Sequence, residues 1–381
     1  MKILLISDNR FPDADAGAVR EHVLASMLIR EKHTLYRVGR FCDKKANIDN
    51  IRCISVPDKG KNSKGNKINL LLFNYNVLKL VKKSHKQYHF DAFLITGCKA
   101  RLVKALKRFA IKNNIKLVYN AVEYYSEEQF KYGKFARQFI NNRTIANDVI
   151  DKNFRVIGIS TFLQELFLKR GIETIRIPFI LNKETVKCNF SSNDKVEIAY
   201  VGRPSRSKDY LKEFIDAMSK LSKNELEKIH LTLVGVNRQQ LNNNYAISEE
   251  TLEYIGNSIT AKGLLVRGEA MKILSNVDFT ILYRSDKEVY AKAGFPTKVT
   301  ESLMSGVPVI TNLTSDLGMY IKDGKNGLVI EEKEDIVECY RKAINMSKEK
   351  IYEMKLNARA VAEKDLDSQN YIKELNLLFE K

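Results

Sequence analysis

The sequence lacks tryptophan altogether and has only six prolines and five cysteines among its 381 residues. The cysteines lie far apart and form no Cys-x-x-Cys pair; they are Cys42, Cys53, Cys98, Cys188 and Cys339. An odd number of scattered thiols argues against a disulfide framework and against a cysteine-based zinc site. We therefore expect reduced thiols in a cytoplasmic protein.

Long hydrophobic runs are also missing. No apolar stretch approaches the roughly 18 residues of a membrane-spanning helix. The apolar run of residues 3–6 is too short for the core of a signal peptide and fits a first β-strand. With 44% apolar residues, the chain can form two domains with full hydrophobic cores.

Acidic residues are scarce in the first half of the chain. Residues 1–190 contain 36 basic residues (Lys and Arg) but only 17 acidic ones (Asp and Glu). The remaining residues contain 28 basic and 29 acidic residues. Between Lys59 and Lys116, fifteen basic residues accompany a single acid, Asp91. The net charge of +18 therefore belongs to the N-terminal half. It predicts an anionic partner such as a phospholipid surface, a polyphosphate or nucleic acid.

Short apolar segments alternate with helical ones along the chain. The predicted strands are residues 2–7, 35–40, 91–96, 115–120, 155–160 and 174–180, then 196–202, 231–236, 277–283, 307–312 and 327–330. This alternation predicts parallel sheets covered by helices on both faces. The pattern restarts after a polar stretch at 182–194, so we predict two Rossmann-like, doubly wound domains, residues 1–185 and 186–365. A C-terminal helix, 366–381, is expected to pack back on the first domain, and a ligand cleft is expected between the domains.

The stretch GFPTKVTESLMSGVPVI, residues 294–310, suits a strand–helix–strand unit of a nucleotide site. Pro296 fits the first turn of a helix over 297–304, and Gly306 fits its left-handed end. The helix N-terminus offers free N–H groups to an anion. Glu301 can then accept hydrogen bonds from a ribose diol, or it can be an exposed acid favoured by the helix dipole.

Two further loops carry residues that suit phosphate. In YVGRPSRSKDY, Gly202 ends a strand, and Arg203 and Lys208 are cations that can stabilise a departing diphosphate or merely belong to a basic surface. After the first strand, Gly17 opens a helix at a small-residue turn, where backbone N–H groups can approach phosphate. The nearby Asp13-Ala14-Asp15 forms a DxD sequence, either a metal-nucleotide ligand or an ordinary polar loop.

These segments together resemble the nucleotide-sugar glycosyltransferases of the GT-B fold, in particular the retaining glycosyltransferase family 4 (group 1) of bacterial polysaccharide type. The matching pieces, in order, are the strand–loop–helix of 9–28, VIGIS, IRIPFILN, VGRPSRSKD, LTLVGV, VDFTILYR and GFPTKVTESLMSGVPVITN with its continuation to GLVI. The resemblance implies sugar transfer with retention. Arg203, Lys208 and the helix N-terminus at 296–298 would stabilise the departing diphosphate, so we expect that no metal is needed.

The resemblance also assigns roles to residues of this sequence. Arg203 and Lys208 match the family's donor-diphosphate cations, and Glu301 matches the second acid of its E-x7-E motif, which binds the ribose. The first acid of that motif would fall at Ala293, so this chain lacks it. Lys298 and Arg284 are candidates to make the contacts near the diphosphate or sugar that the missing acid would otherwise make. The loop of Gly294, Phe295, Pro296 and Thr297 can add backbone contacts.

A second departure from the family lies in the first half. Many members of the family have a histidine after a central strand, and this histidine contacts the donor sugar. None of the five histidines of this chain lies at such a place. The corresponding stretch reads VYNAVEYYSEEQFKYGK, residues 118–134, and resembles a segment of some bacterial polysaccharide transferases. Glu123 can orient the acceptor hydroxyl or the donor sugar, or it can cap a helix.

Residues 69–87, NLLLFNYNVLKLVKKSHKQ, combine apolar positions with four lysines. This composition suits an interfacial helix on an anionic membrane leaflet. A core helix with one solvated basic face explains it as well. No nucleic-acid reader motif is present, so we expect no nucleic-acid partner.

We therefore predict a cytoplasmic glycosyltransferase, peripheral on the inner face of the membrane. It would transfer a sugar from an NDP-sugar, with UDP-sugars favoured, to a saccharide or lipid-diphosphate-linked acceptor in surface polysaccharide synthesis. We expect no cofactor and no metal. The alternatives are a nucleotide-sugar epimerase of the same fold and a non-catalytic nucleotide-sugar-binding partner of an assembly complex.

Overall fold

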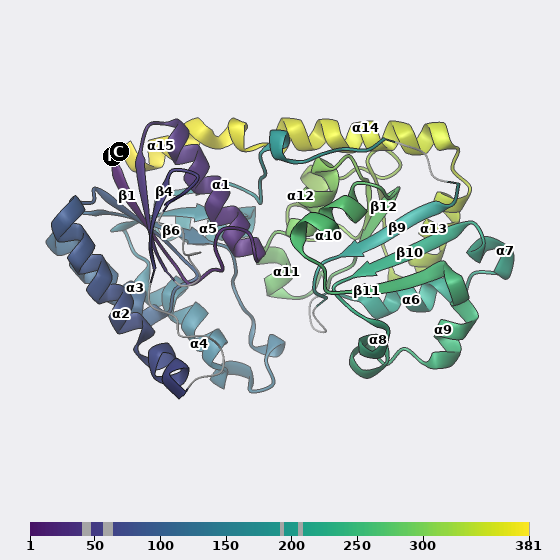
Figure 1. Ribbon diagram of the computed structural model, residues 1–381, viewed down its shortest axis with the longest axis horizontal. Coiled ribbons are helices and arrows are strands. Elements are labelled where there is room, and N and C mark those ends of the chain that lie inside the picture. The colour runs from purple at the N-terminus through teal and green to yellow at the C-terminus, as the bar shows by residue number, and fades with distance from the viewer. Residues whose placement is uncertain (40–46, 56–63, 191–193, 205–208, 381) are drawn as a thin grey trace. The chain divides into compact units, whose positions relative to one another are not determined.

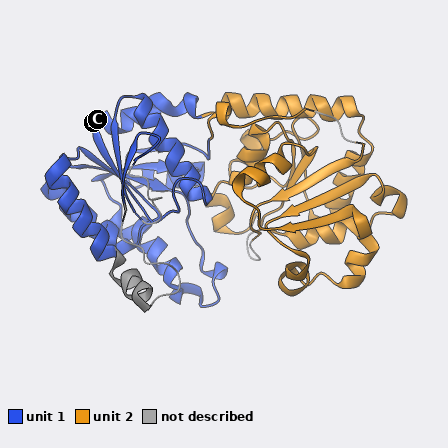
Figure 2. Cartoon of the chain, viewed as in Figure 1, with its two compact units in different colours: residues 1–180, 368–381 blue, residues 181–367 orange. Residues whose placement is uncertain are grey.

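The computed structural model describes residues 1–39, 47–55, 64–190, 194–204 and 209–380. The chain forms two compact units: Met1–Ile180 with Ser368–Lys381 is unit 1, and Leu181–Asp367 is unit 2 (Figure 2). The sequence predicts a first domain that ends at residue 185 and a second domain that ends at residue 365, so both observed boundaries lie within a few residues of the expected ones. Cys98, Cys188 and Cys339 are free thiols, and Cys42 lies outside the described residues.

Unit 1 is built on an eight-stranded sheet of order β3-β4-β2-β1-β5-β6-β7-β8. Its strands are β1 (Lys2–Ser7), β2 (Thr34–Gly39), β3 (Asn47–Ile48), β4 (Ile51–Ser55), β5 (Ala92–Thr96), β6 (Lys116–Ala121), β7 (Phe154–Gly158) and β8 (Thr174–Arg176). All neighbouring strands pair in parallel except β3 and β4. These two short strands were not expected from the sequence, because each carries too few apolar residues to form a recognisable run.

Helices cover both faces of this sheet (Figure 1). They are α1 (Ala16–Arg30), α2 (Lys64–Tyr88), α3 (Ala100–Lys112), α4 (Arg137–Thr144), α5 (Thr161–Leu168) and the C-terminal α15 (Ile372–Glu380). Successive strand residues alternate between the two faces. Thus Ile3 and Leu5 share a core with α1 and α15, whereas Phe93 stacks on Phe109 of α3 with ring centroids 6.3 Å apart. The C-terminal helix therefore belongs to unit 1.

Unit 2 contains a six-stranded, all-parallel sheet of order β11-β10-β9-β12-β13-β14. Its strands are β9 (Val196–Val201), β10 (Ile229–Val234), β11 (Ile259–Gly263), β12 (Phe279–Leu282), β13 (Val309–Thr311) and β14 (Gly327–Val329). This is the strand order 3-2-1-4-5-6 of a Rossmann domain. The sequence predicts all of these strands except β11, whose residues ITAKG include few apolar side chains.

The helices of unit 2 again pack on both faces of the sheet. They are α6 (Leu211–Met218), α7 (Lys223–Leu226), α8 (Arg238–Tyr245), α9 (Glu249–Ile255), α10 (Arg267–Leu274), α11 (Val289–Ala293), α12 (Thr297–Met304), α13 (Ile336–Ile344) and α14 (Lys348–Asp365). Phe214 of α6 and Tyr340 of α13 join the larger core cluster of this unit. Leu274 of α10 packs in a smaller cluster with Ala199 and Val307.

Each sheet has a point where the chain order reverses. In unit 1 the point lies between β1 and β5, and in unit 2 between β9 and β12. Connections leave such neighbouring strands in opposite directions, so a crevice opens at their carboxyl ends. The loops after β9 and β12 are those that carry most of the predicted site residues.

Candidate functional site

Helix α12 begins where the sequence predicts a nucleotide-binding helix. It spans Thr297–Met304, as expected, with Pro296 at the N-cap position and no side chain capping it. The first N–H groups of a helix have no partner within it, so this end can bind an anion. Gly306 has φ +71° and ends the helix, which confirms its predicted left-handed conformation. An added Cβ there would lie 2.7 Å from Cε1 of Phe190, so only glycine fits.

Buried Asp209 joins two of the predicted cations. Its Oδ1 accepts a hydrogen bond from Nε of Arg284 at 3.0 Å, and its Oδ2 accepts one from Nζ of Lys298 at 2.9 Å. Tyr200 Oη donates to Oδ2 at 2.7 Å. The side chain of Asp209 is only 4% exposed. The structure thus brings Arg284 and Lys298 together at the carboxyl ends of β9 and β12.

The carboxylate of Asp209 is stabilised in its charged form. Burial alone would raise its pKa, but the positive charges of Lys298 and Arg284, with hydrogen bonds from Tyr200 and Lys298, hold the pKa well below its usual range. Asp209 therefore offsets one of the two positive charges. No pattern in the sequence marks Asp209 as a site residue, because it precedes a helix in an ordinary polar loop.

Gly202 brings the loop after β9 against Lys298. It has φ +138°, and an added Cβ would lie 2.5 Å from Cε of Lys298. The neighbouring Arg203 is exposed and makes no ion pair with any described residue. Arg203 is therefore available to an anionic ligand. The predicted partner cation, Lys208, lies outside the described residues.

Glu301 makes a contact that the sequence did not predict. Its Oε1 accepts a hydrogen bond from Nη1 of Arg267, the first residue of α10, at 2.7 Å. The side chain of Glu301 is 13% exposed and that of Arg267 is 34% exposed. Within the described part of the chain, Oε2 of Glu301 has no hydrogen-bond partner. One carboxylate oxygen is thus oriented by Arg267, and the other is available to a ligand hydroxyl.

The loop before α12 offers fewer backbone donors than its sequence suggests. The N–H of Gly294 donates to the carbonyl of Tyr290 at 2.9 Å, and Pro296 has no N–H. Phe295 is buried edge-on against Tyr320, with ring centroids 5.6 Å apart. Ala293, at the place of the family's first acid, is completely buried. Among the described residues, the N–H groups of Thr297 and Lys298 have no partner outside α12, and the first N–H groups of a helix have none within it. Both groups are therefore donors at the start of α12.

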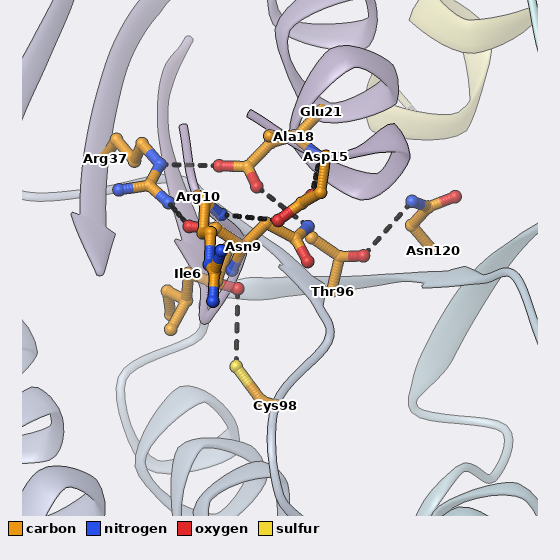
Figure 3. A network of polar contacts seen from close by, with 11 residues as sticks. Ile6, Asn9, Arg10, Asp15, Ala18, Glu21, Arg37, Thr96, Cys98 and Asn120 are labelled. Atoms are coloured by element: carbon orange, nitrogen blue, oxygen red, sulfur yellow. Dashed lines mark hydrogen bonds and ion pairs between the residues drawn. The ribbon is translucent and has the colours of Figure 1, made fainter. Parts of the chain in front are cut away.

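Gly17 lies in unit 1, at the start of α1. Asp15 caps this helix by accepting from the N–H of Ala18 at 2.8 Å, and it also accepts from the N–H of Arg10 at 3.1 Å (Figure 3). The second acid of the DxD sequence is therefore a helix cap. An added Cβ at Gly17 would lie 2.8 Å from Oδ1 of Asn9, which shows how closely the loop after β1 folds over the helix start.

Glu123 lies in the loop after β6 and is exposed. Its carboxylate accepts a hydrogen bond from the hydroxyl of Tyr125, and its carbonyl accepts one from Nδ2 of Asn142 at 3.0 Å. The next short helix is capped by Ser126 and Gln129. The capping interpretation of Glu123 is therefore wrong, and its carboxylate remains on the surface.

The basic segment that begins at residue 69 lies on α2, whose side chains are described from residue 74. Val77, Val81 and Ser84 are buried, whereas its lysines, Lys79, Lys82, Lys83 and Lys86, are exposed. This part is a core helix with one basic face, the second of the two interpretations. No helix in the described ranges is both long and apolar enough to cross a bilayer.

A protein-family match covers nearly all of unit 2. Residues 182–361 match the family described as glycosyl transferases group 1. Unit 2 of this chain is therefore similar to the group 1 glycosyltransferases, and the match covers slightly less than half of the chain. The matched span includes Arg203, Arg284, Lys298 and Glu301. No curated protein sequence matches the chain.

Solved structures of similar fold match the chain over both of its units. Sucrose-phosphate synthase from Thermosynechococcus elongatus has a TM-score of 0.74 and 18% identity, covering 100% of this chain and 98% of its own. HepE from Anabaena, in complex with UDP and glucose, has a TM-score of 0.70 and 16% identity. This match covers 99% of the present chain and 98% of the HepE chain. WaaG, a glycosyltransferase involved in lipopolysaccharide biosynthesis, has a TM-score of 0.70 and 16% identity, covering 100% of both chains. The shared architecture confirms the predicted GT-B fold.

Proposed function

We propose that the protein transfers a sugar from a nucleoside-diphosphate sugar, held by unit 2, to a saccharide acceptor held by unit 1. The observation that carries the proposal is Glu301, which has one carboxylate oxygen held by Arg267 and the other available one turn after the start of α12. A ribose diol needs such an acceptor, and a diphosphate needs the N–H groups and cations beside it.

The leaving diphosphate would be stabilised by groups of this chain. Arg203 is exposed after β9, and Lys298 with Arg284 carries one positive charge more than Asp209 balances. Lys208 would add a further cation. Fixed positive groups at the place where negative charge develops lower the barrier to departure. This charge is the basis for proposing transfer without a metal or another cofactor.

The nature of the donor and acceptor is proposed from the relatives. HepE is seen with UDP and glucose, so we favour a UDP-sugar as donor. WaaG takes part in lipopolysaccharide biosynthesis, so we favour a surface saccharide or its lipid-diphosphate-linked form as acceptor. Retention of the anomeric configuration belongs to the same proposal. The exposed carboxylate of Glu123 and the helix start at Gly17 are candidates to contact the acceptor or the donor phosphate.

A cytoplasmic protein peripheral on an anionic membrane is the second part of the proposal. Helices α2 and α3 pack against each other in unit 1, with the ring centroids of His85 and Phe109 5.5 Å apart. The exposed cations of α3, Arg101, Lys104, Arg108 and Lys112, add to those of α2, and neither helix contains an acid. Such a face attracts anionic lipid headgroups, among which a lipid-linked acceptor would be found.

The experiment that tests the activity measures UDP release from a panel of UDP-sugars, with and without saccharide acceptors. We expect slow release by hydrolysis with one donor and faster release with an acceptor, and the product sugar should keep the donor's anomeric configuration. Binding of a UDP-sugar without any release would instead support a non-catalytic binding protein. Completely buried Ala293, where the family has an acid, is the observation that favours this second candidate.

A further inference from the structure

A buried ion pair lies beneath the carboxyl ends of β1 and β2 in unit 1. Nε of Arg37, on β2, donates to Oε1 of Glu21, on α1, at 2.7 Å, and both side chains have no exposed surface. An apolar pair of the same volume often stabilises a core as well as a buried ion pair does. Stability alone therefore does not explain Glu21 and Arg37, and the groups around them indicate what the pair holds in place.

The pair fixes the side-chain amide of Asn9, in the loop after β1. Nδ2 of Asn9 donates to Oε2 of Glu21 at 3.1 Å, and the carbonyl of Asn9 accepts from Nη2 of Arg37 at 3.0 Å. The N–H of Asn9 donates to Oγ of Ser7 at 3.0 Å. Figure 3 shows Asn9, Glu21 and Arg37 converging in this way. Because the carboxylate must face the Nδ2 group, Oδ1 points away from the ion pair.

The helix that carries Glu21 is itself anchored. Arg20, the preceding residue, is buried and donates from Nε to Oδ1 of Asn120 at 3.0 Å. Its Nη1 and Nη2 donate to the carbonyls of Pro178 and Ile177 at 2.5 and 2.8 Å. Neighbouring strands and the chain after β8 thus hold α1 in place. Glu21 therefore presents its carboxylate to Asn9 from a fixed position.

Two glycines leave the amide oxygen of Asn9 uncovered. An added Cβ would lie 2.8 Å from Oδ1 at Gly17 and 3.1 Å from it at Gly97, which has φ +63°. Gly17 follows β1 and Gly97 follows β5, so the two loops flank the point where the strand order reverses. Asn9 is partly exposed, and its Oδ1 accepts no hydrogen bond from any described residue. The arrangement is a fixed hydrogen-bond acceptor, on a partly exposed residue, between two small residues.

We propose that Oδ1 of Asn9 accepts a hydrogen bond from a hydroxyl of the saccharide acceptor, and that Glu21 and Arg37 are positioning residues for this contact. This inference rests on the proposed function, in which unit 1 binds the acceptor. A carbonyl oxygen attracts a hydroxyl and repels the oxygens of a phosphate. The chemistry of this site therefore selects a sugar hydroxyl over an anion, although the neighbouring loop contains a glycine at a helix start.

The first test measures the affinity of the full chain for octyl β-glycosides of glucose, galactose and N-acetylglucosamine, by calorimetry below their micelle concentrations. We expect at least one to bind, and Asn9→Ala to weaken that binding about tenfold, as the loss of one hydrogen bond predicts. Asp13→Asn, an exposed change in the same loop, is the matched control and should bind as the wild type does. Absence of binding by all three glycosides, or equal binding by Asn9→Ala, would overturn the proposal.

The second test exchanges the acid and the amide. In Glu21→Gln, the new NH2 group faces Asn9, so the Asn9 amide must turn and present its own NH2 outward. In Asn9→Asp, two carboxylates face each other. The double variant N9D/E21Q keeps the charge beside Arg37 and again presents an oxygen outward. We expect about tenfold weaker glycoside binding in each single variant and recovery to within about threefold in the double variant.

If the double variant binds the glycoside as weakly as the single variants do, the positioning roles of Glu21 and Arg37 are contradicted. A purely structural ion pair predicts no recovery of glycoside affinity in the double variant. UDP affinity, measured on the same samples, separates this inference from the proposed function. It should be unchanged in every variant, because the nucleotide is assigned to unit 2. Glycoside binding with no UDP binding would refute the donor site and leave Asn9 in place as a sugar contact.

Discussion

Nη1 of Arg267 lies 2.7 Å from Oε1 of Glu301. This contact gives the carboxylate a defined direction before any ligand arrives, and it leaves Oε2 to meet a hydroxyl. An acid that is already oriented loses less conformational entropy when it binds than a freely rotating one. Arg267 is therefore expected to contribute to nucleotide affinity although it need not contact the nucleotide.

Arg267→Ala should weaken UDP binding about three- to tenfold, because Glu301 loses its orientation and a charge-assisted hydrogen bond. Calorimetry with UDP measures this effect. Arg238→Ala is the matched control, since Arg238 also starts a helix of unit 2 and pairs with an acid, Glu249, at 2.9 Å. Equal losses in both variants would show that the effect of Arg267 is not specific to the site.

Asp209→Asn should destabilise unit 2 by about 3–5 kcal/mol, because it leaves two partly buried cations without their carboxylate. The pKa of Asp209 is lowered from its usual value of 3.8, so its ion pairs stabilise the fold fully above that pH and lose this effect as the pH falls below it. The difference in unfolding temperature between wild type and variant should be constant from pH 7 to about pH 5 and should narrow towards pH 3. A difference that stays constant down to pH 3 would contradict the charged state assigned to Asp209.

Gly202→Ala should strain the loop after β9 and displace Lys298, because Gly202 has φ +138° and the new Cβ would lie 2.5 Å from Cε of Lys298. We expect a loss of about 1–3 kcal/mol in the free energy of unfolding and a severalfold weaker UDP affinity. Gly268→Ala is the control, since an added Cβ there meets nothing within 4 Å. Chemical denaturation of both variants checks the prediction, and equal stability of the two would contradict it.

Replacement of Lys79, Lys82, Lys83 and Lys86 by Gln should reduce sedimentation with vesicles containing anionic lipid. At roughly 1 kcal/mol for each lysine near the surface, we expect at least a tenfold loss at low salt. Substituting four exposed lysines of unit 2, Lys220, Lys228, Lys262 and Lys272, keeps the change in net charge the same and should have little effect. Equal losses in both quadruple variants would show that only the total charge matters.

Elements with strong local patterns could be predicted from the sequence. The buried strands of both sheets contain continuous apolar runs, and α12 is bounded by Pro296 and Gly306, whose backbone preferences fix its ends. The strands β3, β4 and β11 have no such run, and their pairing depends on neighbours in the sheet. Local patterns therefore specify the Rossmann-like cores but not the edges of the sheets.

The contacts within the candidate sites could not be predicted, because they join residues far apart in the chain. Arg267 and Glu301 are separated by 34 positions, and Asp209 and Lys298 by 89. The sequence offered Lys298 and Arg284 as separate candidates for contacts near the diphosphate or sugar, and it contained no reason to choose Asp209 as the acid between them. Asn9 was missed for the same reason, since its role depends on Glu21 and Arg37 from two other elements.

The most direct test of the donor site is the affinity of Glu301→Ala for UDP, measured by calorimetry on the full chain. The carboxylate of Glu301 is proposed to accept hydrogen bonds from the ribose diol, so its loss should weaken binding about ten- to a hundredfold. The variant should keep the wild-type fold, because only the partly exposed Arg267 loses a partner. An unchanged affinity for UDP in a folded Glu301→Ala protein would contradict the assignment of unit 2 as the nucleotide-binding unit.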